Sequence, residues 1–221
     1  MRLSIAYMLV ILFTLCLGIT AQGMVIELFE DDPDFTAKIP NTDTATTIEA
    51  AKDVKYQGKI SIRLESDPGV NNGQHYSPNI AGWTYQITKN PGADDEARWI
   101  LFAWKKDAGE GIMIQFPNNG AWGGQPNGGR YFDGVNKAGW AGIQLAEEAP
   151  REWEVQIRDL FDDFGEFTLT GIALTQYDNV GYYDSIYLAW TEKELKDMLN
   201  KWEPVEPLEK LAIQWGKVKI R

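Results

Sequence analysis

Residues 59–65, Lys-Ile-Ser-Ile-Arg-Leu-Glu, alternate polar and apolar side chains. A strand that turns one face to water and the other to a core has this period of two. Further short segments are rich in aromatic and β-branched residues and lie between clusters of Gly, Pro, Asn and Asp, as strands joined by turns do. The other predicted strands are Val25 to Phe29, Trp83 to Thr88, Trp99 to Lys105, Gly111 to Phe116, Trp153 to Asp159, Phe167 to Thr175 and Asp184 to Trp190.

No helical periodicity separates these strands, so the sequence predicts two packed antiparallel sheets in an all-β sandwich over residues 24–190. A short C-terminal helix is predicted over residues 191–202. There Thr191 and Glu194 have the spacing of a capping box, and an apolar stripe follows them. Residues 159–165 are expected to form a single helical turn between two strands.

Both ends of the chain differ in composition from the sandwich. Residues 1–23 combine Arg2, an apolar run over 5–19 and small residues up to Gly23, which predicts a signal peptide and a secreted, periplasmic or extracellular protein. A retained anchor is the alternative, although the run is shorter than a spanning helix requires. With the signal removed, no membrane insertion is expected. Residues 203–221 are predicted to form an extended tail, either an edge strand or a segment that docks on a cell-surface protein.

Charge and composition exclude several classes of function. The formal net charge is -11, so the basic surface of a nucleic-acid-binding protein is missing, and anionic membranes are poor partners. One cysteine excludes a disulfide framework and thiolate zinc sites, and one histidine excludes His-rich metal sites. The sequence also lacks a serine nucleophile elbow, a phosphate-binding glycine loop and a dinucleotide fingerprint.

The stretch 118–140 is rich in glycine and asparagine and carries aromatic rings that a polar loop does not need for its own stability. Sugars present C–H patches on their ring faces and hydroxyls at their rims, which suit aromatic faces and directional hydrogen-bonding groups. The stretch therefore predicts a glycan-binding surface, unless Trp122 and Trp140 fold back to close the mouth of the sandwich. The candidate ligand-binding residues are Trp122, Arg130, Tyr131, Asn136 and Trp140.

Acidic residues follow the first strand and open the last one, and a sandwich can bring these strands side by side. Glu27, Glu30 and Asp184 are the candidate metal ligands, because hard carboxylate oxygens together with backbone carbonyls suit Ca²⁺. The predicted cofactor is a structural calcium ion. The alternative is a solvated acidic loop that keeps an edge strand from pairing with another chain.

Two further features bear on catalysis. His75 lies in a stretch whose composition predicts a turn or loop, where an ordinary exposed histidine is the common case and a catalytic base the rarer one. Glu152, Glu154 and Gln156 share the polar face of a predicted strand, and a pair of carboxylates across a groove is what glycoside hydrolysis requires. The alternative is that these polar side chains simply lie on the solvent-exposed face of an outer strand.

Several segments resemble a galactose-binding-like domain, in the version found in exported proteins of planctomycete-type and sponge-symbiont-type bacteria. They are residues 97–106, 111–116, 130–134, 152–165, 167–175 and 184–188, with 153–188 the most specific part. The resemblance implies a jelly-roll sandwich that binds carbohydrate through loops at one end. It also implies a structural Ca²⁺ between the first and last strands, at positions matched by Glu27, Glu30 and Asp184.

The sequence thus favours a secreted, non-catalytic carbohydrate-binding module, with a polysaccharide or glycan as partner. One alternative is a polysaccharide lyase or hydrolase that uses Tyr131 and Arg130 with His75 or Glu154. The other is a structural or adhesive surface protein that recruits a partner through its tail.

Overall fold

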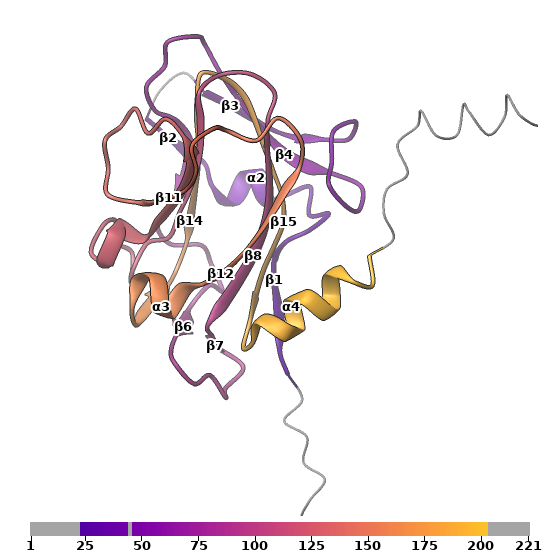
Figure 1. The fold of residues 1–221 in the computed structure, drawn as a ribbon, viewed down its shortest axis with the longest axis vertical. Helices are drawn as coiled ribbons and strands as arrows, with labels where there is room; N and C mark the ends of the chain where they lie inside the picture. Colours follow the sequence, from indigo (N-terminus) through magenta and orange to yellow (C-terminus); the bar gives the residue numbers. More distant parts are fainter. Residues whose placement is uncertain (1–22, 44–45, 203–221) are drawn as a thin grey trace, which may run out of the picture.

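The computed structural model describes residues 23–43 and 46–202. Strands are the main regular structure of this part, arranged in two large sheets that face each other and one small sheet. Figure 1 shows the two large sheets on opposite sides of the molecule. The predicted all-β sandwich with a short C-terminal helix is confirmed. The predicted signal peptide and tail lie outside the described residues.

Sheet 1 has the strand order β12-β8-β15-β4-β3, and β1 pairs with the end of β15. Its neighbours are antiparallel, and β15 is its central strand. The register of β15 shifts between Asp184 and Tyr187, next to the point where β1 joins it. Sheet 1 comprises β1 (Val25–Phe29), β3 (Thr46–Ala51), β4 (Ser61–Ser66), β8 (Trp99–Lys106), β12 (Glu154–Asp159) and β15 (Asn179–Ala189).

Sheet 2 has the strand order β11-β10-β9-β14-β5-β2. All its pairs are antiparallel except β10 and β11, which run parallel. Sheet 2 comprises β2 (Asn41–Thr42), β5 (Gly73–Ser77), β9 (Gly111–Gln115), β10 (Arg130–Gly134), β11 (Ile143–Ala146) and β14 (Ile172–Tyr177). Sheet 3 joins β13 (Phe167–Leu169), β6 (Tyr85–Ile87) and β7 (Glu96–Ala97), with β6 and β7 parallel.

Several predicted segments differ from the structure. The predicted strand Phe167 to Thr175 is interrupted and becomes β13 and β14, in different sheets. Gly171 lies at the break, packed so closely against the Ser77 carbonyl that a Cβ atom would collide with it. The predicted loop around His75 is strand β5 instead, because the pairing with β14 and β2 overrides its turn-forming composition.

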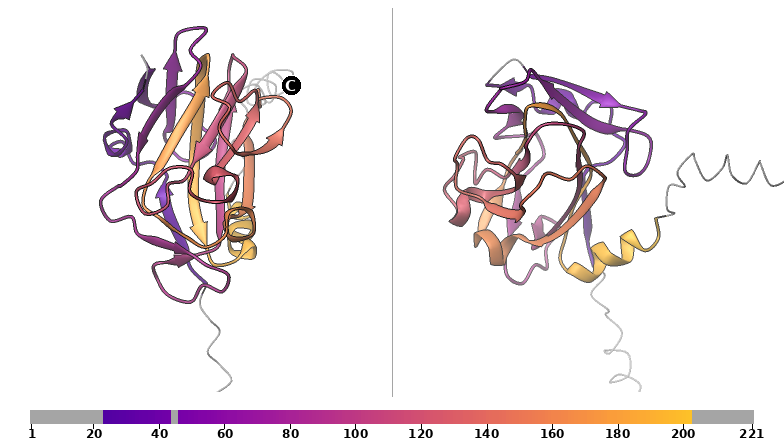
Figure 2. Two further views of the ribbon diagram at one scale, coloured as in Figure 1. Left: turned by 90° about the vertical axis from the view of Figure 1, so that its left-hand side faces the viewer. Right: turned by 45° about the horizontal axis from the view of Figure 1, so that its top comes forward.

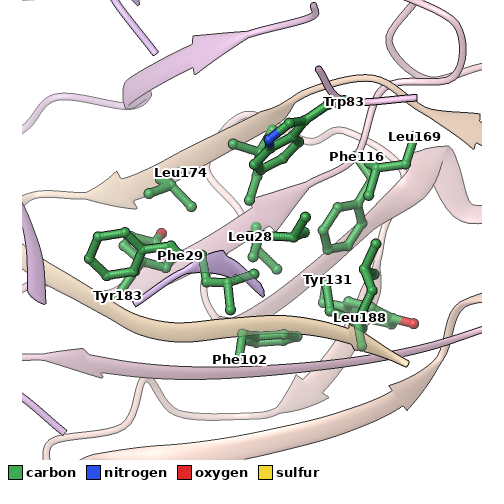
Figure 3. Packing of buried hydrophobic residues seen from close by; sticks show 14 of the residues in the cluster. Leu28, Phe29, Trp83, Phe102, Phe116, Tyr131, Leu169, Leu174, Tyr183 and Leu188 are labelled. Atoms are coloured by element: carbon green, nitrogen blue, oxygen red, sulfur yellow. The ribbon is translucent and has the colours of Figure 1, made fainter. Parts of the chain in front are cut away.

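Aromatic and aliphatic side chains fill the space between the two large sheets (Figure 3). Phe102 of β8 and Tyr131 of β10 stack across the gap, with ring centroids 6.1 Å apart. Tyr183 of β15 donates a hydrogen bond to the Met113 carbonyl of β9 at 2.8 Å, so its hydroxyl is satisfied inside the core. The sandwich is thereby held together by packing and by polar links from one sheet to the other.

The described part of the chain also contains four short helical segments: α2 (Phe35–Lys38), the 3-10 turn η1 (Pro126–Gly129), α3 (Leu160–Phe164) and α4 (Glu192–Leu199). Thr191 and Glu194 form the capping box of α4, as the sequence predicts. Leu195 is fully buried against Leu101 and Tyr187, so α4 covers part of the outer face of sheet 1 (Figures 1 and 2). Within the described residues, none of the helices has the length and apolar character needed to cross a membrane.

Candidate functional site

A cavity of about 260 Å³ lies on the outer face of sheet 2. Its floor comes from three adjacent strands, and its walls come from the segment between β9 and β10 and the segment between β10 and β11. The cavity is lined by Asp43, Gln74, Tyr76, Gln115, Trp122, Arg130, Trp140 and Ala173.

The floor of the cavity is a network of polar side chains that satisfy one another. Register places Gln74 opposite Thr175 and Gln115 opposite Ala173, so these side chains share one face of the sheet. Gln115 Nε2 donates to Gln74 Oε1 at 3.0 Å and to Thr175 Oγ1 at 2.7 Å, and Thr175 Oγ1 donates to Gln74 Oε1 at 3.2 Å. Because each side chain is buried and bonded to the others, the floor is rigid.

Arg130 forms one end of the cavity. Its Nε donates to Gln115 Oε1 at 2.7 Å, and its Nη1 donates to the Ala141 carbonyl at 3.3 Å. The guanidinium carbon lies 5.1 Å from the centre of the Trp140 ring. Burial lowers the pKa of Arg130 from its ordinary value.

Asp43 and two aromatic rings form the other end. Tyr76 donates from its hydroxyl to Asp43 Oδ1 at 2.8 Å, and Gln74 donates from its amide to Asp43 Oδ2. The hydrogen bond to Asp43 raises the pKa of Tyr76. Trp122 meets the Tyr76 ring edge to face, with centroids 5.9 Å apart. The carboxylate is therefore held in place while its residue stays exposed.

Glycine and asparagine shape the two segments that carry the indoles. Gly129 has φ +66°, and a side chain there would collide with Gln125, whose Nε2 donates to the Phe116 carbonyl at 2.9 Å. Asn136 closes the turn before Trp140, since its Nδ2 donates to the Trp140 carbonyl at 2.7 Å and its Oδ1 accepts from the Gly139 amide at 3.1 Å. These contacts fix where Trp140 lies.

The structure brings three of the five predicted ligand-binding residues together. Trp122, Arg130 and Trp140 line the cavity, and both indoles are half-buried on the outside of the sheet. They do not close the mouth of the sandwich. Asn136 does not line the cavity, and its side chain instead donates to the Trp140 carbonyl.

Tyr131 is the exception, and the structure corrects its predicted place. Its side chain is fully buried in the core, and its hydroxyl donates to Asp163 Oδ2 at 2.7 Å. The cause is the strand itself: neighbours along β10 point to opposite faces, so Arg130 faces the cavity and Tyr131 faces inward. Burial raises the pKa of the Tyr131 hydroxyl well above its ordinary range.

Sequence reasoning missed the cavity residues that come from β5 and from the end of β9. Gln74 and Tyr76 alternate within β5, and Gln115 is a buried polar residue at the end of an otherwise apolar strand. A glutamine at the end of an apolar strand needs hydrogen-bond partners when it is buried, and this could have indicated polar neighbours on the adjacent strands. Asp43 gave no signal of its own.

The predicted metal ligands are brought together only in part. Asp184 is fully buried and accepts from the Tyr56 amide at 2.7 Å, while burial and nearby Glu30 raise its pKa to about 7. Burial also raises the pKa of Glu30, whose Oε1 is buried without a hydrogen-bond partner. Glu27 is exposed.

These two carboxylates offer oxygen ligands of the kind that Ca²⁺ prefers, with an orphaned buried oxygen among them. However, across residues 23–43 and 46–202 no group of three or more Asp, Glu, His or Cys side chains is arranged to hold a metal ion. A calcium ion here would need backbone carbonyls to complete its shell. Calcium binding stays a prediction.

The residues named for a lyase or hydrolase do not meet in the cavity. His75 is buried on β5, where its ring nitrogens contact the Ile39 carbonyl at 3.3 Å and the Thr46 carbonyl at 2.8 Å. Glu154 lies on β12 in the other sheet and accepts from Gln156 at 2.6 Å. Tyr131 points into the core, so Arg130 alone of this set reaches the cavity.

Neither a family model nor a curated protein matches the chain. Among solved structures, it is similar to the family 30 carbohydrate-binding module of a cellulosomal cellulase of Clostridium thermocellum, with 14% identity and a TM-score of 0.44 over 76% of this chain and 99% of that one. It is also similar to a family 29 carbohydrate-binding module from Piromyces equi, with 9% identity and a TM-score of 0.35 over 77% of this chain and 92% of that one.

A third similar structure is the glycoside hydrolase domain of Endo-D from Streptococcus pneumoniae, with 10% identity and a TM-score of 0.43. The match covers 67% of this chain but 21% of that one, so the chain spans about a fifth of that protein's length. All three similarities are too distant to transfer a function to this chain.

Proposed function

We propose that the protein is a non-catalytic carbohydrate-binding module, and that the cavity on the outer face of sheet 2 holds one sugar residue of a glycan. The observation that carries this proposal is the pair of half-buried indoles, Trp122 and Trp140, that lines a floor of amide and hydroxyl groups. Aromatic faces pack against the C–H patches of a sugar, and Arg130 and Asp43 at the two ends of the cavity supply a donor and an acceptor for its hydroxyls.

The shape and rigidity of the cavity support the same proposal. Its volume of about 260 Å³ lies just below the roughly 300–1,000 Å³ of sites that enclose a drug-sized ligand, so a single ring fits and the rest of a chain stays outside. Gln74, Gln115 and Thr175 are already fixed by their mutual hydrogen bonds. A preorganised floor loses little conformational entropy when a ligand binds.

Binding without cleavage is proposed because the candidate catalytic residues are spread over both sheets and the core, with Arg130 alone in the cavity. We also propose that the module is exported. The basis is the apolar run over residues 5–19, which follows Arg2 and ends near small residues.

The proposal is tested by isothermal titration against a panel of soluble oligosaccharides, with Trp122→Ala and Trp140→Ala as variants. Each substitution removes a ring that lines the cavity and is expected to weaken binding about tenfold or more. Trp153→Ala is the matched control, because Trp153 contacts Tyr56 and Tyr182 on sheet 1, away from the cavity. It should bind like the unmodified protein.

Two outcomes would contradict the proposal. One is the absence of heat with every glycan at millimolar concentration. The other is binding that Trp122→Ala and Trp140→Ala leave unchanged while Trp153→Ala abolishes it, which would move the site to the other sheet.

A further inference from the structure

Arg130 carries a charge that the described residues leave unbalanced. Its residue is 8% exposed, and its two hydrogen bonds go to neutral acceptors, the Gln115 side chain and the Ala141 carbonyl. None of the ion pairs found in residues 23–43 and 46–202 includes it. Buried charges in proteins are usually paired, so an unpaired one beside a cavity points to an anionic ligand.

Other arginines of the chain show the usual arrangement. Arg63, Arg98 and Arg158 each pair with a carboxylate, although their side chains are 22–32% exposed and water could solvate them. Arg130 is less exposed and has the Trp140 ring at 5.1 Å. An aromatic face attracts a cation more weakly than a carboxylate does, so the ring compensates the charge only in part.

Asp43 gives the cavity a second charge of opposite sign. Arg130 and Asp43 both line the cavity yet form no ion pair with each other. A ligand placed between them meets hydrogen-bond donors at the Arg130 end and an acceptor at the Asp43 end. A carboxylate accepts hydrogen bonds from a guanidinium, and sugar hydroxyls donate to a carboxylate.

We infer that the cavity selects a uronic acid residue of a glycan, with the sugar carboxylate on Arg130 and ring hydroxyls on Asp43. This inference rests on the proposed carbohydrate-binding function and narrows its ligand. The indoles of Trp122 and Trp140 supply the apolar contact that any sugar ring needs, so the charged pair supplies the selectivity.

The net charge of -11 limits which acidic glycans fit. A polymer with a carboxylate on every residue is repelled by the protein as a whole, whereas an isolated uronate interacts mainly with the charges within a Debye length, about 8 Å at physiological ionic strength. The expected ligand is therefore a single uronate at a branch or chain end of an otherwise neutral glycan.

The test compares two oligosaccharides that differ in one group: a neutral oligosaccharide with one terminal uronate, and the same molecule with its carboxylate reduced to an alcohol. Isothermal titration of the unmodified protein should show the uronate bound roughly 10- to 100-fold more tightly at low salt. Arg130→Gln should remove that preference. Arg151→Gln is the matched control, because exposed Arg151 donates to backbone carbonyls elsewhere.

Each outcome decides between the two proposals. Equal affinity for both oligosaccharides would overturn the uronate inference and leave the carbohydrate-binding function standing. If the protein binds neither oligosaccharide and no glycan of the wider panel, both the uronate inference and the carbohydrate-binding proposal are overturned. The comparison of ligands on the unmodified protein holds even where Arg130→Gln fails to fold.

Discussion

At the scale of single residues, Asp133 is the only carboxyl group in residues 23–43 and 46–202 with both oxygens buried and without a hydrogen-bond partner. It is fully buried on β10, and neither of its oxygens has a hydrogen-bond partner of good geometry. Burial first, and the charge of Glu154 second, raise the pKa of Asp133 to about 7, while the Ala146 amide and the Trp104 indole act in the opposite direction. The folded protein therefore keeps a proton that an unfolded chain releases near pH 4.

This raised pKa makes stability depend on pH in a defined direction. Between about pH 4 and 7 the folded state binds more protons than the unfolded state, so the free energy of unfolding falls as pH rises and levels off above 7. An asparagine at position 133 stays neutral at every pH. In Asp133→Asn, the decrease in the free energy of unfolding over this pH range should therefore be smaller by roughly 2–4 kcal/mol. Denaturant unfolding from pH 5 to 8 measures it. Parallel curves for the two proteins would contradict the assigned pKa.

Residue identity alone predicted part of the site. The aromatic and arginine residues of 118–140 stood out, because rings on a glycine-rich stretch have no evident structural use. Whether Arg130 or Tyr131 faces the ligand depends on which face of strand β10 packs against the core. The composition of this stretch predicts a loop, and a loop has no regular alternation of side chains between two faces. The orientation of these two side chains follows only from the pairing of β10 with β9.

At the scale of elements, most of the alternating and aromatic strands were predicted, and several strands without such a pattern were missed. Val25–Phe29 has its predicted bounds, whereas β5 and β10 were assigned to loops. These two strands are held by partners on each side, β14 and β2 for β5, and β9 and β11 for β10. Pairing of this kind is non-local, so local composition could not reveal it.

The seam where β1 meets β15 carries the calcium prediction. A bound ion would separate the charges of Glu30 and Asp184 and stabilise the folded state by about 2.7 kcal/mol at one hundred times its dissociation constant. Calcium should then raise the melting temperature, and a chelator should lower it. Glu30→Gln should abolish the shift. Glu166→Gln is the control, because Glu166 is exposed and lies between α3 and β13, outside the three candidate ligands. A melting temperature that neither calcium nor a chelator changes would contradict the proposed calcium site.

At the scale of the whole molecule, the two outer faces of the sandwich differ. Helix α4 covers part of the outer face of sheet 1 (Figure 1). The rings of Tyr56, Trp153 and Trp202 pack against one another on the same side of the molecule. Sheet 2 instead carries the cavity with its two indoles on its outer face. The fold class followed from the strand pattern, but the difference between the faces depends on where α4 docks, and no strand pattern specifies that.

The central claim is that a sugar binds on the outer face of sheet 2, and an NMR titration of the indole N–H signals tests it most directly. Adding an oligosaccharide that gives heat in the panel should shift the signals of Trp122 and Trp140 and leave those of Trp153 and Trp190 in place, since the latter lie outside the cavity. Shifts confined to Trp153 or Trp190, with Trp122 and Trp140 unmoved, would contradict the account.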